Sequence, residues 1–348
     1  MIDVYYDGSF FPLTPDWTKL IDISGRSFGR TSYWINRAIK RAHKDARQRF
    51  IYLRRSDTEM DEVLASGFGK NMLLTDYYGT YYRERGMSIK TAQKKIFLTY
   101  NGKEELVGYT RTLNNVKGID LDDVDLIIFD EFIAVMRNQY KGGAAGTREP
   151  ELFDRFIHTV FRRRKNCHVI MLGNQDALDT PTNPYNEYYK IPFKAKKYTN
   201  KAIGLMYRHW DGAGDVGGTA DKLSSANAET YNRSVLGDSQ DIISDNFITS
   251  RTPNSLYMCA MLYQSTVLTL WIDVETGVLY VHDNYKLDKN KPFYTAFNDD
   301  MTVDSCLLIA SQFPQLKSIK VKYYSNQIRY NNQYTASKML DVISIIKQ

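Results

Sequence analysis

One short stretch constrains the fold of this chain more than any other: residues 125–132, which read Asp-Leu-Ile-Ile-Phe-Asp-Glu-Phe. Its four consecutive apolar residues, mostly β-branched or aromatic, predict a strand buried on both faces, as in a parallel sheet. Asp130 and Glu131 follow where such a strand reaches the carboxyl edge of its sheet, the edge at which ligands usually bind. One acid there can hold Mg²⁺ and its neighbour can polarise a water molecule. The alternative is a strand end that carries two solvated acids.

A second stretch, upstream, favours the catalytic interpretation. Residues 20–23 predict a short strand, a loop that contains several small residues follows, and a helix begins near Thr31. The N–H groups of such a loop and the helix dipole favour an anion, so this order predicts a phosphate-binding loop. The predicted loop consists of Ser24, Gly25, Arg26, Ser27, Phe28, Gly29, Arg30 and Thr31.

The loop departs from the usual G-x-x-x-x-G-K-[S/T] pattern at two positions. Ser24 replaces the first Gly, and Arg30 stands where Lys is expected. With the later Asp130-Glu131 pair, the loop still predicts Walker A and Walker B motifs that bind Mg·ATP, with Thr31 and Asp130 at the metal. Arg is longer than Lys and its planar fork cannot take the same place. Either Arg26 or Arg30 serves the phosphates in an altered pose, or hydrolysis is weakened, or Arg30 is an introduced substitution.

Further elements upstream of the central strand support an α/β fold. Residues 49–55 form a second strand that ends in Arg54 and Arg55, which are solvated ends, nucleic-acid contacts or ion-pair partners. Residues 57–65 read as a helix with Asp57 as its N-cap. Asn101-Gly102 between two apolar segments predicts a hairpin over residues 94–112.

Downstream of the central strand, residues 136–146 form a basic loop with Arg137 and Lys141, which suits a phosphate backbone or is simply solvated. A helix from Pro150 ends in cations that begin with Arg162, a pattern that also complements the helix dipole. Asn174 ends another buried strand at the same sheet edge, where its amide can sense a γ-phosphate or orient water. The alternation of strands and helices over residues 20–174 predicts a parallel sheet with crossover helices.

The C-terminal part of the chain has a different pattern. Residues 179–245 are rich in turn-forming types and predict a linker region with short helices. Three meandering strands (256–263, 266–274, 278–283), a helix at 306–313, a strand at 318–323 and a helix at 335–346 suggest an RNase H-like fold. Nucleases of that fold carry a metal-binding acid on the first strand. Residues 257–261 offer none, so two-metal cleavage is disfavoured.

Composition sets wider bounds. A net charge of +6 permits a polyanionic partner without requiring one. The three cysteines lie far apart with no metal spacing, which fits a reducing compartment. No apolar run approaches the ~18 residues of a membrane span, and no signal-peptide pattern begins the chain. We therefore expect a cytosolic protein without a membrane partner.

Together these stretches resemble the genome-packaging ATPases of small, protein-primed podoviruses, compact relatives of the large terminases. The matching segments are residues 24–33, 50–55, 127–133, 159–162, 174, 183–185, 236–240 and 271–274. The resemblance implies a RecA-like (ASCE) P-loop ATPase domain at 1–200, a linker region at 201–245 and a vestigial RNase H-like domain at 246–348.

The resemblance also implies a function and partners. It implies a homo-oligomeric ring, a pentamer, mounted on the capsid portal with a packaging RNA, which uses ATP and Mg²⁺ to drive double-stranded DNA into the procapsid. Such a protein works in the cytoplasm of the infected bacterial host, transiently on the procapsid vertex. Asp130 is then the Mg²⁺ acid and Glu131 activates water. Arg162 matches an arginine finger that reaches the neighbouring subunit's nucleotide, and Lys117 matches a second basic residue acting between subunits.

Two other functions stay open at this level. A terminase with an active nuclease is disfavoured by the acid-free strand at 257–261. A nucleotide-dependent DNA-binding scaffold with little turnover is kept open by Arg30.

Overall fold

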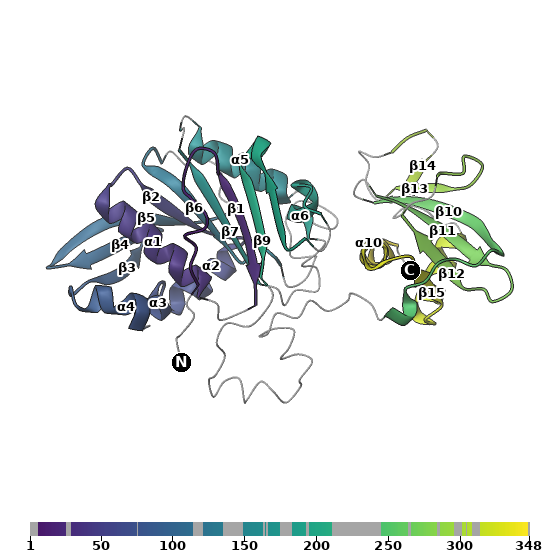
Figure 1. Ribbon diagram of the computed structural model, residues 1–348, viewed down its shortest axis with the longest axis horizontal. Coiled ribbons are helices and arrows are strands. Elements are labelled where there is room, and N and C mark those ends of the chain that lie inside the picture. Colours follow the sequence, from purple (N-terminus) through teal and green to yellow (C-terminus); the bar gives the residue numbers. More distant parts are fainter. Residues whose placement is uncertain are drawn as a thin grey trace, which may run out of the picture. The chain divides into compact units, whose positions relative to one another are not determined.

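The computed structural model describes residues 6–25, 29–74, 76–113, 121–134, 149–162, 164, 166–174, 183–192, 195–210, 245–263, 266–283, 286–295, 301–303, 305–307 and 314–346. The chain divides into two compact units, Met1–Ser239 and Gln240–Gln348, and each is described by itself (Figure 1). Within the described ranges, no helix combines the length and apolar character that crossing a membrane requires.

The first unit is built on a nine-stranded sheet. From edge to edge it contains β3 (Ser88–Ala92), β4 (Lys95–Tyr100), β5 (Lys103–Thr112), β2 (Arg49–Arg54), β6 (Val124–Asp130), β7 (His168–Asn174), β1 (Lys19–Ser24), β9 (Leu205–His209) and β8 (Lys197–Asn200). The strands from β5 to β9 pair in parallel, while β3, β4 and β8 pair antiparallel with their neighbours. This arrangement brings the carboxyl ends of β2, β6, β7 and β1 to one edge.

Helices cover both faces of this sheet (Figure 1). The helices α1 (Arg30–Lys44), α2 (Asp57–Ala65), α3 (Lys70–Leu74) and α4 (Asp76–Arg83) contribute to one apolar core, in which Trp34 and Ile39 are buried. The helices α5 (Glu149–Phe161) and α6 (Pro184–Tyr188) contribute to the core on the opposite face, through Phe153, Phe156 and Tyr185. All seven residues of β6 are buried, as a strand between two covered faces requires.

Most elements expected in this unit are confirmed. β1, β2, β6, β7, α1, α2 and α5 lie where the apolar patterns predict them. The hairpin at Asn101-Gly102 is confirmed as β4 and β5. Both turn residues have positive φ, 49° at Asn101 and 72° at Gly102, which a tight two-residue turn requires.

Two expectations for this unit are wrong. The N-cap of α2 is Ser56, whose Oγ accepts the Glu59 N–H at 3.3 Å, and not Asp57, which begins the helix. The domain boundary at residue 200 is too early, because β9 pairs with β1 inside the main sheet. Residues 201–210 therefore belong to the first unit, and the remainder of the expected linker, 211–244, lies outside the described residues.

The second unit contains a six-stranded sheet. Its order is β14 (Ser305–Leu307), β13 (Phe293–Thr295), β10 (Ser255–Tyr263), β11 (Thr266–Asp273), β12 (Leu279–His282) and β15 (Ile328–Tyr330). β10, β11 and β12 form the expected antiparallel meander, whereas β13 joins β10 in parallel. The helices α9 (Pro314–Tyr324) and α10 (Gln333–Ile345) follow, the second close to its expected range.

The expected strand at 318–323 is wrong, because these residues lie in α9. Ile319, Val321 and Tyr323 alternate with polar residues and so mimic a strand pattern. In the structure Leu316 and Ile319 are buried at helical spacing, while Val321 is exposed. The strand follows later, as β15. The helix expected at 306–313 is also not found at its start, where residues 305–307 form β14, and residues 308–313 lie outside the described ranges.

Candidate active site

The candidate site lies at the carboxyl edge of the large sheet. β7 lies between β1 and β6, so the phosphate loop that follows β1 and the acids that end β6 are separated by one strand. Ser24 is paired in register with Asn174, and Asp130 with Leu172. The ends of three strands therefore meet at one level, with α1 beginning directly above them at Arg30.

Thr31 and Asp130 are brought into contact at this edge. The Thr31 hydroxyl lies in the first turn of α1 and donates a hydrogen bond of 3.0 Å to Asp130 Oδ1. The other carboxylate oxygen, Oδ2, accepts a 2.6 Å hydrogen bond from the Tyr52 hydroxyl of β2. A hydroxyl and a carboxylate at this spacing are the protein ligands that Mg²⁺ takes when phosphates and water complete its octahedron. The residues present therefore fit a magnesium–nucleotide complex.

A buried arginine from β2 holds both acids. Arg54 is 7% exposed, and its guanidinium lies 3.1 Å from Asp130 Oδ2 and 2.5 Å from Glu131 Oε2. Its Nε also donates to the Tyr52 hydroxyl at 3.0 Å. Burial lowers the pKa of Arg54, but the nearby Asp130, Tyr52 and Glu131 together raise it by more, so the pKa is raised overall. Arg54 is therefore a permanent cation here, and a metal at Asp130 competes with it for the carboxylate.

Glu131 leaves the strand in an unusual conformation. Its φ is +55°, in the left-handed region that non-glycine residues seldom adopt. Its side chain is 51% exposed, so one side of the carboxylate remains open to water while the other meets Arg54. Backbone strain of this kind gathers at functional sites because the surrounding structure must hold it. The arrangement presents a carboxylate that can accept a proton from water once Arg54 withdraws.

The guanidinium of Arg30 is bound by groups at the ends of β1 and β7. Its Nη1 donates to the backbone carbonyls of Asp22, at 2.7 Å, and Gly173, at 2.8 Å. Its Nη2 donates to Asn174 Oδ1 at 3.1 Å. Burial raises the pKa of the Asp22 carboxyl, and the charge of Arg30 opposes that rise. In this structure Arg30 thus ties β1 to β7, a role that the compact ammonium of lysine could not fill with the same set of bonds.

Arg55 forms a second buried ion pair next to the site. Its Nε lies 3.1 Å from both carboxylate oxygens of Glu149, the first residue of α5, and its backbone N–H donates to Glu59 at 3.0 Å. Its Nη2 donates to the Phe132 carbonyl, just beyond the paired acids. Arg54 and Arg55 are therefore ion-pair partners, one of the three roles left open for them. Both side chains are buried, and the contact with DNA that was also expected of them stays a prediction.

The remaining predicted residues are spread over the unit. Asn174 joins the site through Arg30, and Gly29, with φ +76°, caps the start of α1. Arg162 directly follows α5, is exposed, and forms no ion pair with any described residue. The residues outside the described ranges are Arg26, Ser27, Phe28, Lys117, Arg137 and Lys141.

Sequence reasoning missed Tyr52 and Glu149. Tyr52 lies within an apolar strand and gives no polar signal of its own. Glu149 precedes Pro150 and reads as an ordinary first-turn acid. A usable signal was the Arg54-Arg55 pair at a buried strand end, since buried cations require acids close by.

The fold and this edge define a class: a mixed α/β protein in which Thr31, at the start of the helix after β1, contacts Asp130, at the end of β6, across one intervening parallel strand. A family model described as Podovirus DNA encapsidation protein (Gp16) matches residues 21–345. The chain belongs to that family, and it is therefore a bacteriophage DNA-packaging protein.

Relatives and solved structures agree with this assignment. The chain is 24% identical over 324 residues to the DNA packaging proteins of Bacillus phages PZA and phi29, covering 89% of this chain and 87% of each relative. A chain of the bacteriophage Phi-29 viral genome packaging motor assembly superposes with a TM-score of 0.69 at 19% identity. That match covers 99% of this chain and 100% of the other. The resemblance noted from the motifs is confirmed at the level of the family.

Proposed function

We propose that this protein is an ATP-driven motor that translocates double-stranded viral DNA into a procapsid. The observation that carries the proposal is the contact between Thr31 and Asp130 across one intervening strand, beside Glu131. A hydroxyl, a metal-binding acid and a second acid converge at the N-terminus of α1, where an anion is favoured. The packaging context of the family and of the related motor assembly supports DNA as the cargo.

Each residue has a separate task in this proposal. Residues 24–31 of the RecA-like domain hold ATP, and Thr31 and Asp130 hold its Mg²⁺, which neutralises charge on the phosphates. Glu131 orients and deprotonates water. Arg54 holds Glu131 and Asp130 together and must release at least one of them before hydrolysis. Asn174 connects the phosphate loop to the end of β7 through Arg30.

The motor acts as a ring, a pentamer on the capsid portal with a packaging RNA, at the procapsid vertex in the host cytoplasm. The similarity to a chain of a viral genome packaging motor assembly supports an oligomer. Arg162 stabilises charge on the nucleotide of the neighbouring subunit, and Lys117 assists between subunits. Arg137 and Lys141 are the candidate contacts to DNA in the loop after β6.

A scaffold that binds DNA with little turnover is a second candidate function. The observation that favours it is Arg30, whose guanidinium is engaged with backbone carbonyls at the sheet edge. The ATPase rate of the wild-type protein with DNA and procapsids separates the scaffold from the motor.

The Glu131→Gln variant tests the motor proposal. It removes the carboxylate proposed to accept the proton of water but keeps the size of the side chain and an oxygen that can accept the hydrogen bond from Arg54. We expect a fall in ATPase rate of about 10²–10⁴-fold, the usual contribution of a general base, with binding of Mg·ATP retained. Turnover and the binding of a fluorescent ATP analogue are measured in the presence of DNA and procapsids. Equal turnover in the two proteins would remove Glu131 from catalysis, and no turnover in the wild type would favour the scaffold.

The C-terminal unit supplies a second test, because we propose that it is an RNase H-like domain that binds nucleic acid without cutting it. The strand order from β12 through β11, β10 and β13 to β14 supports that fold, and β10 carries no Asp or Glu. The fragment 246–348 is incubated with plasmid and Mn²⁺ or Mg²⁺. We expect the fragment to retard the plasmid in a gel, which shows binding, and to leave the plasmid uncut. Cleavage that EDTA abolishes would instead favour the active-nuclease alternative.

A further inference from the structure

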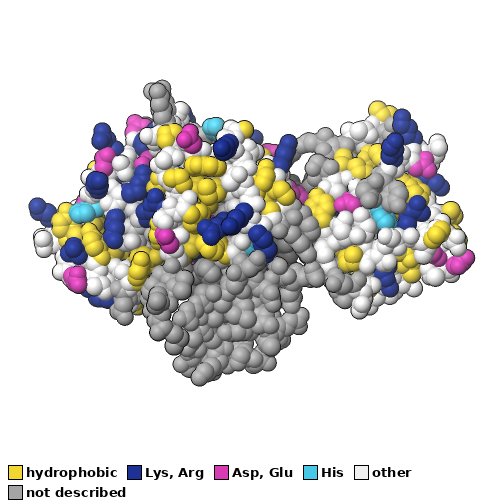
Figure 2. Space-filling model, viewed as in Figure 1, with side chains coloured by type: hydrophobic (Ala, Val, Ile, Leu, Met, Phe, Trp, Pro, Cys, Tyr) yellow, Lys and Arg dark blue, Asp and Glu magenta, His cyan; other side chains and the backbone are white. Residues whose placement is uncertain are grey.

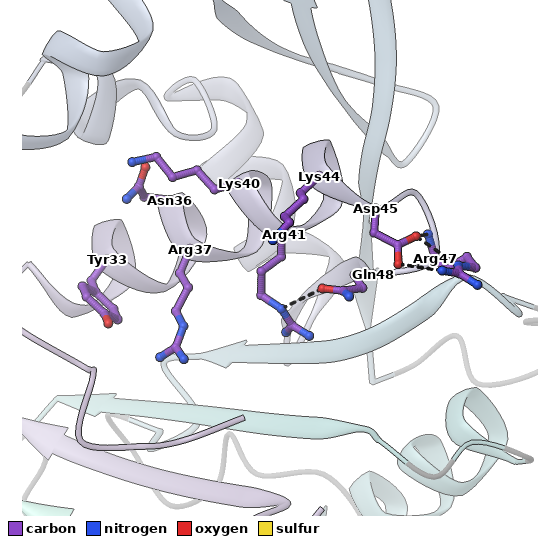
Figure 3. Close-up of a pocket in the computed structure, with 9 residues that line it drawn as sticks. All are labelled: Tyr33, Asn36, Arg37, Lys40, Arg41, Lys44, Asp45, Arg47 and Gln48. Carbon is purple, nitrogen blue, oxygen red and sulfur yellow. Dashed lines mark hydrogen bonds and ion pairs between the residues drawn. The ribbon is translucent and has the colours of Figure 1, made fainter. Parts of the chain in front are cut away.

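An open groove runs along the outer side of α1, away from the nucleotide site. It has a volume of about 870 Å³. It is lined by Tyr33, Asn36, Arg37, Lys40, Arg41, Lys44, Asp45, Arg47 and Gln48 (Figure 3). The groove extends to the turn that leads into β2 and so approaches the amino edge of the sheet, whereas the acids of the active site end β6 at the carboxyl edge. No task has so far been assigned to this surface.

Most charged side chains that line the groove are positive. Arg37 and Arg41 lie four residues apart, as do Lys40 and Lys44, so the two members of each pair share one side of α1. Figure 2 shows Lys and Arg side chains gathered over this part of the unit. Like charges at such spacings destabilise a helix. The helix dipole offsets the cations of the last turn, but Arg37 and Lys40 lie further toward the N-terminus, so helix stability does not account for the pattern.

The acids within reach of the groove are already paired. Arg41 donates to Asp125 Oδ2 at 2.6 Å and to Gln48 at 3.2 Å, and Asp45 is paired with Arg47. These contacts fix the guanidinium of Arg41 on the groove wall. Lys40 and Lys44 are exposed and form no ion pair among the residues that the structure describes. Neither ammonium group is therefore neutralised by a described acid, and the wall of the groove stays positive.

The shape and the aromatic residues indicate which anion fits. The lining residues of α1 span about 16 Å along the helix, so the cations form a line and do not converge on one phosphate. Single strands are gripped by bases stacked on free aromatic faces. Here the ring of Tyr81 beside the groove is occupied by Lys40 and Arg85, each 4.2 Å from the ring centroid. A row of phosphates on a duplex matches this surface better than a nucleotide or a single strand does.

We propose that the α1 groove binds the sugar–phosphate backbone of double-stranded DNA, as a contact separate from the nucleotide site and from the loop at 136–146. The side chains that reach the phosphates are Lys40 and Lys44, and Arg37 and Arg41 add positive charge from the same helix. DNA is chosen over RNA because members of this family encapsidate DNA. Contacts of this kind carry no sequence information, which suits a protein that must move along any sequence.

The test compares two double variants that lose the same charge. Lys40→Gln/Lys44→Gln removes the two exposed lysines of the groove, and glutamine keeps the helix propensity. Lys95→Gln/Lys103→Gln removes two exposed cations from the β4–β5 hairpin. Binding of a labelled DNA duplex to the full chain is measured without nucleotide over a range of salt concentrations. The result therefore does not depend on whether the protein hydrolyses ATP.

We expect the groove variant to bind DNA about tenfold more weakly at low salt, and the slope of log K against log salt to fall by about 2, because two phosphate contacts are lost. The hairpin variant should stay within about twofold of wild type. Equal weakening in the two variants would reduce the effect to net charge and overturn the proposal. An RNA duplex of the same sequence is the second probe. If the groove variant loses affinity for RNA and keeps it for DNA, the proposal is also wrong.

Discussion

Arg162→Ala is expected to lower the ATPase rate of assembled rings by about 10³–10⁵-fold, the contribution of an arginine finger, while nucleotide binding is retained. The reason is its position. α5 begins at Glu149, next to the site, and its 13 residues carry the chain about 20 Å away before Arg162. Arg162 therefore lies far from the phosphate loop of its own subunit, exposed, and without an ion-pair partner among the described residues. If Arg162 serves a nucleotide, that nucleotide is therefore expected to belong to a neighbouring subunit.

Two measurements distinguish this role from a simple interaction with the helix dipole. Arg162→Lys keeps a cation at the end of α5, so a dipole role predicts near-normal ATPase, whereas a finger that needs the guanidinium fork predicts a large loss. Mixing Arg162→Ala with Glu131→Gln protein restores part of the activity if the finger acts on the next subunit. Mixed rings then contain sites with an intact Glu131 and an intact neighbouring arginine. Without any recovery, action between subunits is ruled out; if wild-type rings are inactive, the test is repeated with Arg30→Lys.

Features encoded in short stretches of sequence could be predicted. The buried strand that ends in Asp130-Glu131 was recognisable because every residue of β6 faces a covered side of the sheet. The strand–loop–helix around Thr31 was recognisable because small residues between a strand and a helix start let backbone N–H groups form an anion-binding loop, and this pattern is local in sequence. Placing Thr31 beside Asp130 needed only the rule that parallel strands end at a common edge.

The network around these acids could not be predicted, because it depends on which strands are neighbours. Arg54 meets Asp130 and Glu131 only since β2 pairs with β6, across 76 and 77 residues of sequence. Several strand orders would have been compatible with the same sequence patterns, and each would have given Arg54 other partners. The contacts of Arg30 could not be predicted either, because its partners are mainly backbone carbonyls, which every residue carries.

The misassigned elements have a different cause. In short segments, composition and alternation of apolar and polar residues are weak indicators of secondary structure. β9 has five residues and follows turn-forming sequence, so it read as a linker, yet its pairing with β1 places it in the sheet. Residues 318–323 alternate like a strand, but α9 buries only one narrow side. In both cases the tertiary environment, and not local preference, decides the structure.

Glu149→Gln is expected to lower the free energy of unfolding of the first unit by about 3 kcal/mol, the cost of removing one partner from a buried ion pair. The carboxylate of Glu149 is fully buried. Its two oxygens share the Nε–H of Arg55, itself 3% exposed, and it accepts a further hydrogen bond from the Tyr185 hydroxyl at 2.9 Å. The amide of glutamine keeps the volume but removes the charge. The side chain of Arg55 remains buried, and its ion pair with the partly exposed Glu59 is longer and weaker.

Glu59→Gln is the matched control, since it breaks the other ion pair of the same arginine. That pair is 3.4 Å long with a carboxylate 31% exposed, so solvent screening limits the loss to about 1 kcal/mol or less. Urea unfolding followed by tryptophan fluorescence reports mainly on the first unit, which holds Trp17, Trp34 and Trp210. If the two variants were equally stable, burial would not be what makes the Arg55–Glu149 pair important. A selective loss in Glu149→Gln would show that this ion pair stabilises the packing of the start of α5 against the end of β2, where Arg55 also donates to the Phe132 carbonyl next to the candidate acids.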